Sequence, residues 1–273
     1  MLWLPVSPAA ARRLLTEIES SGRGEHTLAV GGAGELAAVL RQQFLRGRAE
    51  PAAVRLGGPK NADVYVHVLT GEAGEEDLAA LRRAGRERVP AIAVAVGFAG
   101  DVATIPYVRA TDVVRVAAGQ SFPLDTIACA IAARLGEDGA PLAARVPLLR
   151  EAVCERLVAS FARKNGLLAA AVWIPGADLP ILALNELRLV LRLAQAYGAD
   201  SGRERLPELA ATLGAGFGLR ALVRELLDMI PGAGWLLKGV VAYAGTRALG
   251  EAARLRFELA PTPRPGGASH AAP

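Results

Sequence analysis

The residues best placed to do chemistry form a glycine-rich loop, Gly31-Gly32-Ala33-Gly34, between an apolar stretch and a helical pattern. In parallel α/β sheets such a junction binds phosphate, because backbone N–H groups and a helix N-terminus converge there. A P-loop counted from Gly31 would need Gly-Lys-Ser/Thr where residues 36–38 read Leu-Ala-Ala. Glu35 adds a carboxylate that competes with phosphate for the helix dipole. Phosphoryl transfer by this loop is therefore not expected.

The same loop fits a weak dinucleotide-binding pattern. Counted from Gly32, the residues match G-x-G-x-x-A through Gly34 and Ala37. The acidic residue that normally binds the ribose hydroxyls should stand near Gly57, but the carboxylate of Asp63 comes later. Two interpretations stay open: a tight glycine turn between strand and helix, or a loop that binds a nucleotide or NAD.

The histidines and cysteines suggest no further catalytic residue. His67 lies in the apolar stretch VYVHVL with no carboxylate close by in sequence, which favours a neutral, hydrogen-bonded core histidine over a general base. Cys129 lies on an apolar helix face and should be buried. No Cys-x-x-Cys motif and no Cys/His pair at ligand spacing occurs. We expect no catalytic residue and no metal site.

Short apolar stretches alternate with helical patterns in the first half of the chain. The expected strands are residues 26–31, 53–56, 63–69, 91–96 and 112–116, and the expected helices are residues 35–45, 75–88 and 123–135. Strands of continuous Val, Ile and Ala with interleaved helices are typical of a parallel sheet covered on both faces. The pattern predicts a small doubly wound α/β domain over residues 1–138.

Beyond residue 138 the pattern becomes all-α, after a turn expected around Gly139 and Pro141. Helical spacing covers residues 147–164, 166–172, 179–197, 207–229 and 234–259. We predict a helical bundle over residues 139–260. The tail, residues 261–273, has no apolar pattern and is expected to be disordered.

The helical half contains an internal repeat. Trp-Ile-Pro-Gly-Ala-Asp at residues 173–178 recurs as Met-Ile-Pro-Gly-Ala-Gly at residues 229–234. Proline stops or opens a helix and glycine relieves the turn, so two helical-hairpin corners are the simplest interpretation. The alternative is a pair of loops that grip a partner or a ligand. The residues concerned are Pro175, Gly176, Asp178, Pro231, Gly232 and Gly234.

The positive charge belongs to the helical half. Residues 1–138 hold 15 Lys+Arg and 16 Asp+Glu, and the remainder holds 16 and 11, so the two halves carry −1 and +5. A basic, Ala/Leu-rich helical surface suits peripheral docking on anionic lipid. Residues 166–184 are apolar, but two prolines and Asp178 within them favour amphipathic helices over a membrane span. Interspersed acids and only 5% aromatic residues argue against nucleic acid.

The remaining composition indicates the compartment. With 52% apolar residues the chain can form a large core, and two cysteines cannot form a disulfide framework. In the first 20 residues two arginines follow the apolar stretch instead of preceding it, unlike a secretory signal. We expect a cytoplasmic protein, and the sequence leaves its oligomeric state open.

The helical half resembles the domain of unknown function 697 family over residues 148–257. The resemblance rests on the 173–178 motif, Gln-Ala-Tyr-Gly at 195–198, Ile-Pro-Gly-Ala-Gly at 230–234 and Thr-Arg-Ala-Leu-Gly-Glu at 246–251. That family is a helical module often fused to Era-like bacterial GTPases and predicted in several members to be membrane-associated. The first half is similar to the GTPase domain that usually precedes the module, because the stretches after Asp63 and Pro90 look like its fourth and fifth strands.

The GTPase motifs themselves are missing. Besides the P-loop lysine, no D-x-x-G precedes Asp63, and Gly-Phe-Ala-Gly at 97–100 stands where N-K-x-D would follow. The resemblance implies a degenerate G domain, a pseudo-GTPase, joined to an intact helical module. Our first hypothesis is a non-catalytic interaction or scaffold protein, without a cofactor, whose helical module binds a protein partner or a membrane surface. The alternatives are a nucleotide or NAD sensor using residues 32–37 and a GTPase-family protein at the cytoplasmic face of the inner membrane.

Overall fold

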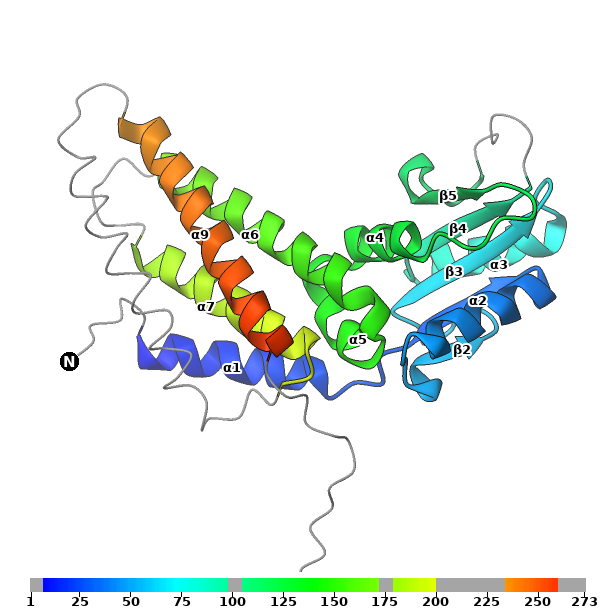
Figure 1. Cartoon of the computed structure of the whole chain (residues 1–273), viewed down its shortest axis with the longest axis horizontal. Coiled ribbons are helices and arrows are strands. Elements are labelled where there is room, and N and C mark those ends of the chain that lie inside the picture. Colours follow the sequence, from blue (N-terminus) through cyan, green and yellow to red (C-terminus); the bar gives the residue numbers. More distant parts are fainter. Residues whose placement is uncertain (1–6, 98–104, 172–178, 200–233, 260–273) are drawn as a thin grey trace, which may run out of the picture.

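The computed structural model describes residues 7–97, 105–171, 179–199 and 234–259 (Figure 1). In these residues a parallel α/β region is followed by a helical region, as the sequence predicts. The strands are β1 (Leu28–Gly32), β2 (Val54–Leu56), β3 (Val64–Thr70), β4 (Ala91–Val96) and β5 (Val113–Val116). The helices α2 (Gly34–Arg46), α3 (Glu75–Arg86) and α4 (Leu124–Leu135) follow β1, β3 and β5.

All strands of this sheet run parallel, in the order β2-β1-β3-β4-β5. Their sequences are rich in Val, Ile, Leu and Ala, because helices cover both faces of the sheet. The chain passes from β1 to the edge strand β2 and then back to β3 on the other side of β1. The strand order therefore reverses between β1 and β3, and doubly wound sheets bind ligands outside the carboxyl ends of the strands at such a reversal.

The two faces of the sheet belong to different cores. Val66 and Val68 of β3 face the side that carries α2 and α4, where they share a core with Leu40 and Ile127. The opposite face packs on α3 in a second core that includes Tyr65, Leu69 and Leu81. The alternation of side chains along β3 thus divides this strand between the two cores.

The helical region consists of α5 (Gly139–Arg145), α6 (Arg150–Ala171), α7 (Leu179–Ala196) and α9 (Gly234–Leu259). The first helix of the chain, α1 (Pro8–Gly22), lies along α7 (Figure 1). Glu17 of α1 forms an ion pair with Arg188 of α7 at 2.7 Å, and Gln195 donates a hydrogen bond to the Ile18 carbonyl at 3.0 Å. A helix from the start of the chain is therefore part of the bundle.

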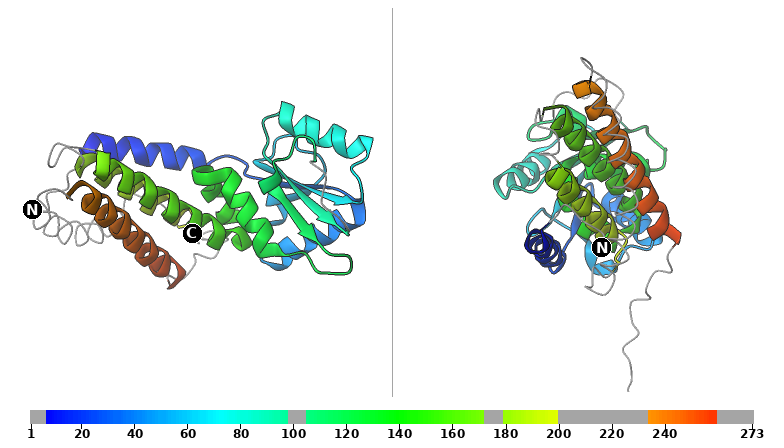
Figure 2. Two further views of the ribbon diagram at one scale, coloured as in Figure 1. Left: turned by 90° about the horizontal axis from the view of Figure 1, so that it is seen from above. Right: turned by 90° about the vertical axis from the view of Figure 1, so that its left-hand side faces the viewer.

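One continuous core joins the sheet to the bundle. The buried residues of β1, α2 and α4 belong to the same cluster as Leu142 of α5, Leu157 of α6 and Leu189 of α7. Figure 2 shows an elongated molecule in which the bundle extends away from one end of the α/β region. Helix α5 lies where the two parts meet (Figure 1).

Two expectations for the helical half are wrong. Separate helices are expected at residues 147–164 and 166–172, but α6 continues without a break through Gly166. A Cβ on Gly166 would lie 3.1 Å from the carbonyl oxygen of Gly239 in α9, so this glycine lets two helices approach closely instead of ending one. The turn expected around Gly139 and Pro141 is the helix α5, whose first five residues are buried. The predicted helix at residues 207–229 and the tail lie outside the described residues.

Candidate functional site

The glycine loop lies at the carboxyl edge of the sheet, where β1 ends and α2 begins. Gly32 has a φ of +94°, and a Cβ there would lie 2.0 Å from the carbonyl oxygen of Val68, so only glycine fits. The N–H of Ala33 donates a hydrogen bond to the same oxygen at 2.9 Å. Contacts with β3 therefore fix the conformation of the loop.

The two other glycines of the loop differ in how much room a side chain would have. A Cβ on Gly31 would lie 2.5 Å from the Tyr65 hydroxyl oxygen, whereas a Cβ on Gly34 would meet no atom within 4 Å. Helix α2 begins at Gly34 without a side-chain cap, and Glu35 lies in its first turn. All three glycines singled out from the sequence line one cavity.

That cavity has a volume of about 360 Å³ and lies between β1, β2, β3 and α3. It is located where the strand order reverses, which is the expected ligand position in a doubly wound sheet. The apolar residues that line it are Val30, Ala37, Leu56 and Ala80, of which Val30 and Ala37 are buried in the core on the opposite face of the sheet. Its polar side chains are Tyr65, His67, Glu76 and Asp77. Besides the loop, Gly57 and Gly58 after β2 line it.

A chain of hydrogen bonds connects three of the polar side chains. The Tyr65 hydroxyl oxygen lies 2.7 Å from Nδ1 of His67, and Nε2 of His67 lies 2.8 Å from Oδ1 of Asp77. A carboxylate only accepts hydrogen bonds, so Nε2 carries the proton, Nδ1 accepts, and Tyr65 donates. The other oxygen of Asp77 accepts the N–H of Gly74 at 3.0 Å, which holds the carboxylate at the start of α3.

Burial favours the neutral forms of the hydrogen-bonded Tyr65 and His67. It raises the pKa of Tyr65 to about 12, and the Asp77 carboxylate adds to that shift. Burial also lowers the pKa of His67, although the hydrogen bond to Asp77 acts in the opposite direction. The expectation of a buried, hydrogen-bonded histidine is confirmed, and the lowered pKa of His67 agrees with the neutral form. Sequence reasoning misses Asp77, because it lies ten residues further along the chain on a different element.

The charged residues that line the cavity are two consecutive acids at the start of α3. Arg55 and Arg83 come close to Gly57 and Gly58, where their guanidinium groups lie 3.9 Å from a Cβ built on each glycine. Neither arginine lines the cavity, and none of its described lining residues is a lysine or an arginine. The lining therefore accepts hydrogen bonds from a ligand but does not neutralise a phosphate.

The cysteines add no reactive group to this site. Cys129 is exposed, so the expectation that it is buried is wrong; only part of the α4 surface faces the core. Cys154 of α6 is buried, and burial raises the pKa of its thiol to about 12. Within the part of the chain that the structure describes, no group of three or more His, Cys, Asp or Glu could hold a metal ion.

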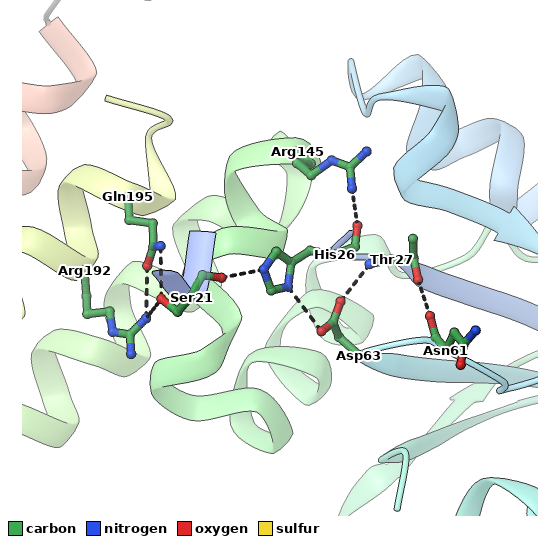
Figure 3. Close-up of polar contacts among 8 residues, drawn as sticks. All are labelled: Ser21, His26, Thr27, Asn61, Asp63, Arg145, Arg192 and Gln195. Carbon is green, nitrogen blue, oxygen red and sulfur yellow. Dashed lines mark hydrogen bonds and ion pairs between the residues drawn. The ribbon is translucent and has the colours of Figure 1, made fainter. Parts of the chain in front are cut away.

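A second polar cluster joins the α/β region to the bundle (Figure 3). We call Ser21, His26, Asp63, Arg145 and Arg192 the junction network. The His26 ring lies between Asp63 (Nδ1 to Oδ1, 3.2 Å) and the Ser21 carbonyl (Nε2 to O, 2.7 Å). Arg145 of α5 donates to the His26 carbonyl at 2.8 Å, and Arg192 of α7 donates to the Ser21 hydroxyl at 2.9 Å. The network therefore ties α1, α5 and α7 to the chain just before β1 and β3.

The end of the bundle that lies away from the sheet is both basic and apolar. This distal end comprises residues 7–16, 163–171, 179–185 and 234–247 (Figure 2). Leu167 is 73% exposed, Val240 is 55% exposed and Ile181 is 50% exposed. These segments contain no Asp or Glu, and their six cations are Arg12, Arg13, Arg163, Lys164, Lys238 and Arg247. Lys164 pairs with Glu137, which lies outside the distal end.

The described residues include part of the apolar stretch at residues 166–184 and one residue of the repeated motif that the sequence singles out. Among the described helices, none is both long and apolar enough to cross a bilayer. Gly234 is the first residue of α9. The other residues singled out in the repeat, Pro175, Gly176, Asp178, Pro231 and Gly232, lie outside the described residues. The hairpin corners stay a prediction.

Comparison with known proteins identifies the bundle. No curated protein and no solved structure matches the chain. A family model does match, with the description Domain of unknown function (DUF697), over residues 141–253. The match begins in α5 and ends in α9, so it includes α6 and α7 but none of the strands. This chain therefore carries a DUF697 domain behind a parallel α/β region.

Proposed function

We propose that this chain is a non-catalytic, pseudo-GTPase-like interaction protein whose helical bundle, formed by α1 and the DUF697 module, docks peripherally on an anionic membrane surface. The observation that carries the proposal is the distal end, whose segments hold six cations, exposed apolar side chains and no Asp or Glu, although Lys164 pairs with Glu137 and Arg247 lies close to Glu251. A Lys or Arg close to anionic lipid contributes about 1 kcal/mol to binding. Exposed apolar side chains add to this when they enter the headgroup region.

The chemistry of the cavity supports the non-catalytic part of the proposal. Glu35, Glu76 and Asp77 bring carboxylates to the place where phosphoryl transfer needs a cation. The N–H of Ala33, in the loop that would hold the phosphates, already donates to Val68. The α/β region then acts as a scaffold for the module and not as a catalyst.

Flotation with vesicles tests the docking. We expect the full chain to float with vesicles that contain phosphatidylserine and to stay behind with pure phosphatidylcholine vesicles. The variant Arg12→Glu/Arg13→Glu should bind more weakly by at least about 2 kcal/mol, because two attractive charges become repulsive. High salt should release the wild-type chain, since the Debye length falls from about 10 Å at 0.1 M to about 3 Å at 1 M.

The matched control is Arg46→Glu/Arg86→Glu, which makes the same change in charge on exposed residues of α2 and α3. This variant should float like the wild type, because both sites belong to the α/β region. Equal losses in the two variants would show that binding depends on net charge and not on the distal end. Hydrolysis of GTP above background by the purified chain, lost in Gly34→Leu, would contradict the non-catalytic part.

A further inference from the structure

The cavity beside the glycine loop takes no part in the proposed membrane docking. Its volume of about 360 Å³ lies in the range of roughly 300–1,000 Å³ that is typical of small-molecule sites. Gly31 and Gly32 let the backbone of β1 come close to the neighbouring strand and to the cavity. The accessible apolar side chains of Leu56 and Ala80 offer a surface for a flat, uncharged group.

The polar side chains of the cavity are acceptors. The proton of the Tyr65 hydroxyl is directed to His67, so its oxygen is left to accept a hydrogen bond. The carboxylate of Glu76 accepts only, and that of Asp77 is already held by His67 and Gly74. A ligand that fits these groups donates hydrogen bonds from hydroxyl or amino groups. Carboxylates bind ribose hydroxyls in this way in dinucleotide-binding sheets.

The same carboxylates disfavour a phosphate. No cation stands among the described lining residues, and Glu35 occupies the first turn of α2. A triphosphate in the cavity would place several negative charges beside these acids. Arg55 and Arg83 lie near Gly57 and Gly58 but outside the lining. The chemistry that remains is that of a nucleoside without its phosphates.

We propose that the cavity between β1, β2, β3 and α3 binds a free nucleoside, whose hydroxyls donate hydrogen bonds to Glu76 and Tyr65 and whose base packs on Leu56 and Ala80. This site differs from the distal end, so either proposal can fail without the other. Binding here makes the α/β region a sensor of an uncharged metabolite.

Thermal shift and calorimetric titration of the full chain test the proposal. The probes are adenosine, guanosine, cytidine and uridine, each compared with its own 5′-triphosphate. The blocking variant is Gly34→Leu, because Gly34 lines the cavity and a Cβ built there meets no protein atom within 4 Å. The matched control is Gly85→Leu in α3, where a Cβ also meets no atom within 4 Å but lies away from this cavity.

We expect at least one nucleoside to stabilise the wild type and Gly85→Leu, and to lose this effect in Gly34→Leu. Its triphosphate should give no stabilisation. In Glu76→Gln the nucleoside should bind more weakly, because a charged acceptor is lost. The proposal is overturned if none of the four nucleosides binds, if a triphosphate binds more tightly than its nucleoside, or if Gly34→Leu binds as well as the wild type.

Discussion

At the residue scale, Tyr65, His67 and Asp77 share two protons along one wall of the cavity. Three physical conditions hold this arrangement. Burial keeps the tyrosine protonated and the imidazole neutral, and the N–H of Gly74 holds the aspartate. These three side chains are therefore a fixed set of hydrogen-bond donors and acceptors near neutral pH. Protonating His67 would place a second proton on Nδ1, the atom that accepts the Tyr65 proton.

The pH dependence of stability should report this neutral histidine. Since burial lowers the pKa of His67, the unfolded chain binds its proton at a higher pH than the native chain does. Stability is then lost as pH falls through 6.5, the ordinary value, towards the lower native value. We expect the free energy of unfolding in urea to fall more between pH of about 7.5 and about 5.5 for the wild type than for His67→Gln.

The comparison isolates one residue, because both proteins keep His26, His270 and every carboxylate. Equal losses of stability in the wild type and His67→Gln over this range would mean that the native and unfolded chains bind the His67 proton alike. That result would contradict the neutral state assigned to the hydrogen-bonded chain.

The sequence predicts where the loop glycines lie, but not which side chains contact one another beside them. Gly31, Gly32 and Gly34 stand directly after an apolar strand, so their place at the edge of a parallel sheet follows from local pattern. The link between His67 and Asp77 does not, because it depends on how α3 packs across β3. Contacts between elements are set by tertiary packing, which a single sequence does not encode locally.

At the scale of elements, glycines set how closely α6 and α9 approach. A Cβ on Gly239 would lie 3.0 Å from the Gly166 carbonyl oxygen, and one on Gly250 would lie 2.6 Å from Cγ2 of Val158. Periodicity predicts α9 to its exact ends and the strands to within a few residues, but it expects a turn where α5 lies and ends a helix before Gly166. A glycine that relieves a turn and one that permits close packing look the same in a sequence.

A double-mutant cycle tests the contact at Gly250. We expect Gly250→Ala to destabilise the chain by about 1–3 kcal/mol through overpacking against Val158. Val158→Ala removes a buried side chain and should cost roughly 1.5–3 kcal/mol. The double variant should be less destabilised than the sum by about 1 kcal/mol, because the new methyl group enters the space that the valine leaves.

Gly85→Ala is the control for helix propensity, since it makes the same change in α3 in open space. It should stabilise the chain by up to about 1 kcal/mol. Denaturant unfolding of the wild type and the four variants measures these differences. Additive effects at Gly250 and Val158 would show that the two helices shift apart to accommodate a methyl group, and that their close approach does not depend on the glycine.

At the scale of the whole molecule, the chain crosses between its two parts more than once. Helix α1 precedes the sheet in sequence but packs on α7, and Arg145 of α5 bonds to the carbonyl of His26 just before β1. The sequence predicts the order of the two regions, which the DUF697 match and the sheet confirm. It does not predict this crossing, because the apolar face of α1 would suit a sheet or a bundle equally well.

Because the core is continuous across α5, we expect the sheet and the bundle to unfold together. Leu142 is fully buried in the cluster that includes β1, α4 and α7, and Leu142→Ala should cost about 2–5 kcal/mol. In Leu142→Ala, hydrogen exchange should show the same loss of protection for the backbone amides of β3 and of α7, because both sets exchange through global unfolding of the molecule. Leu167→Ala, at a side chain that is 73% exposed, should leave both unchanged. If Leu142→Ala accelerated exchange in α7 alone, the sheet and the bundle would be independent units.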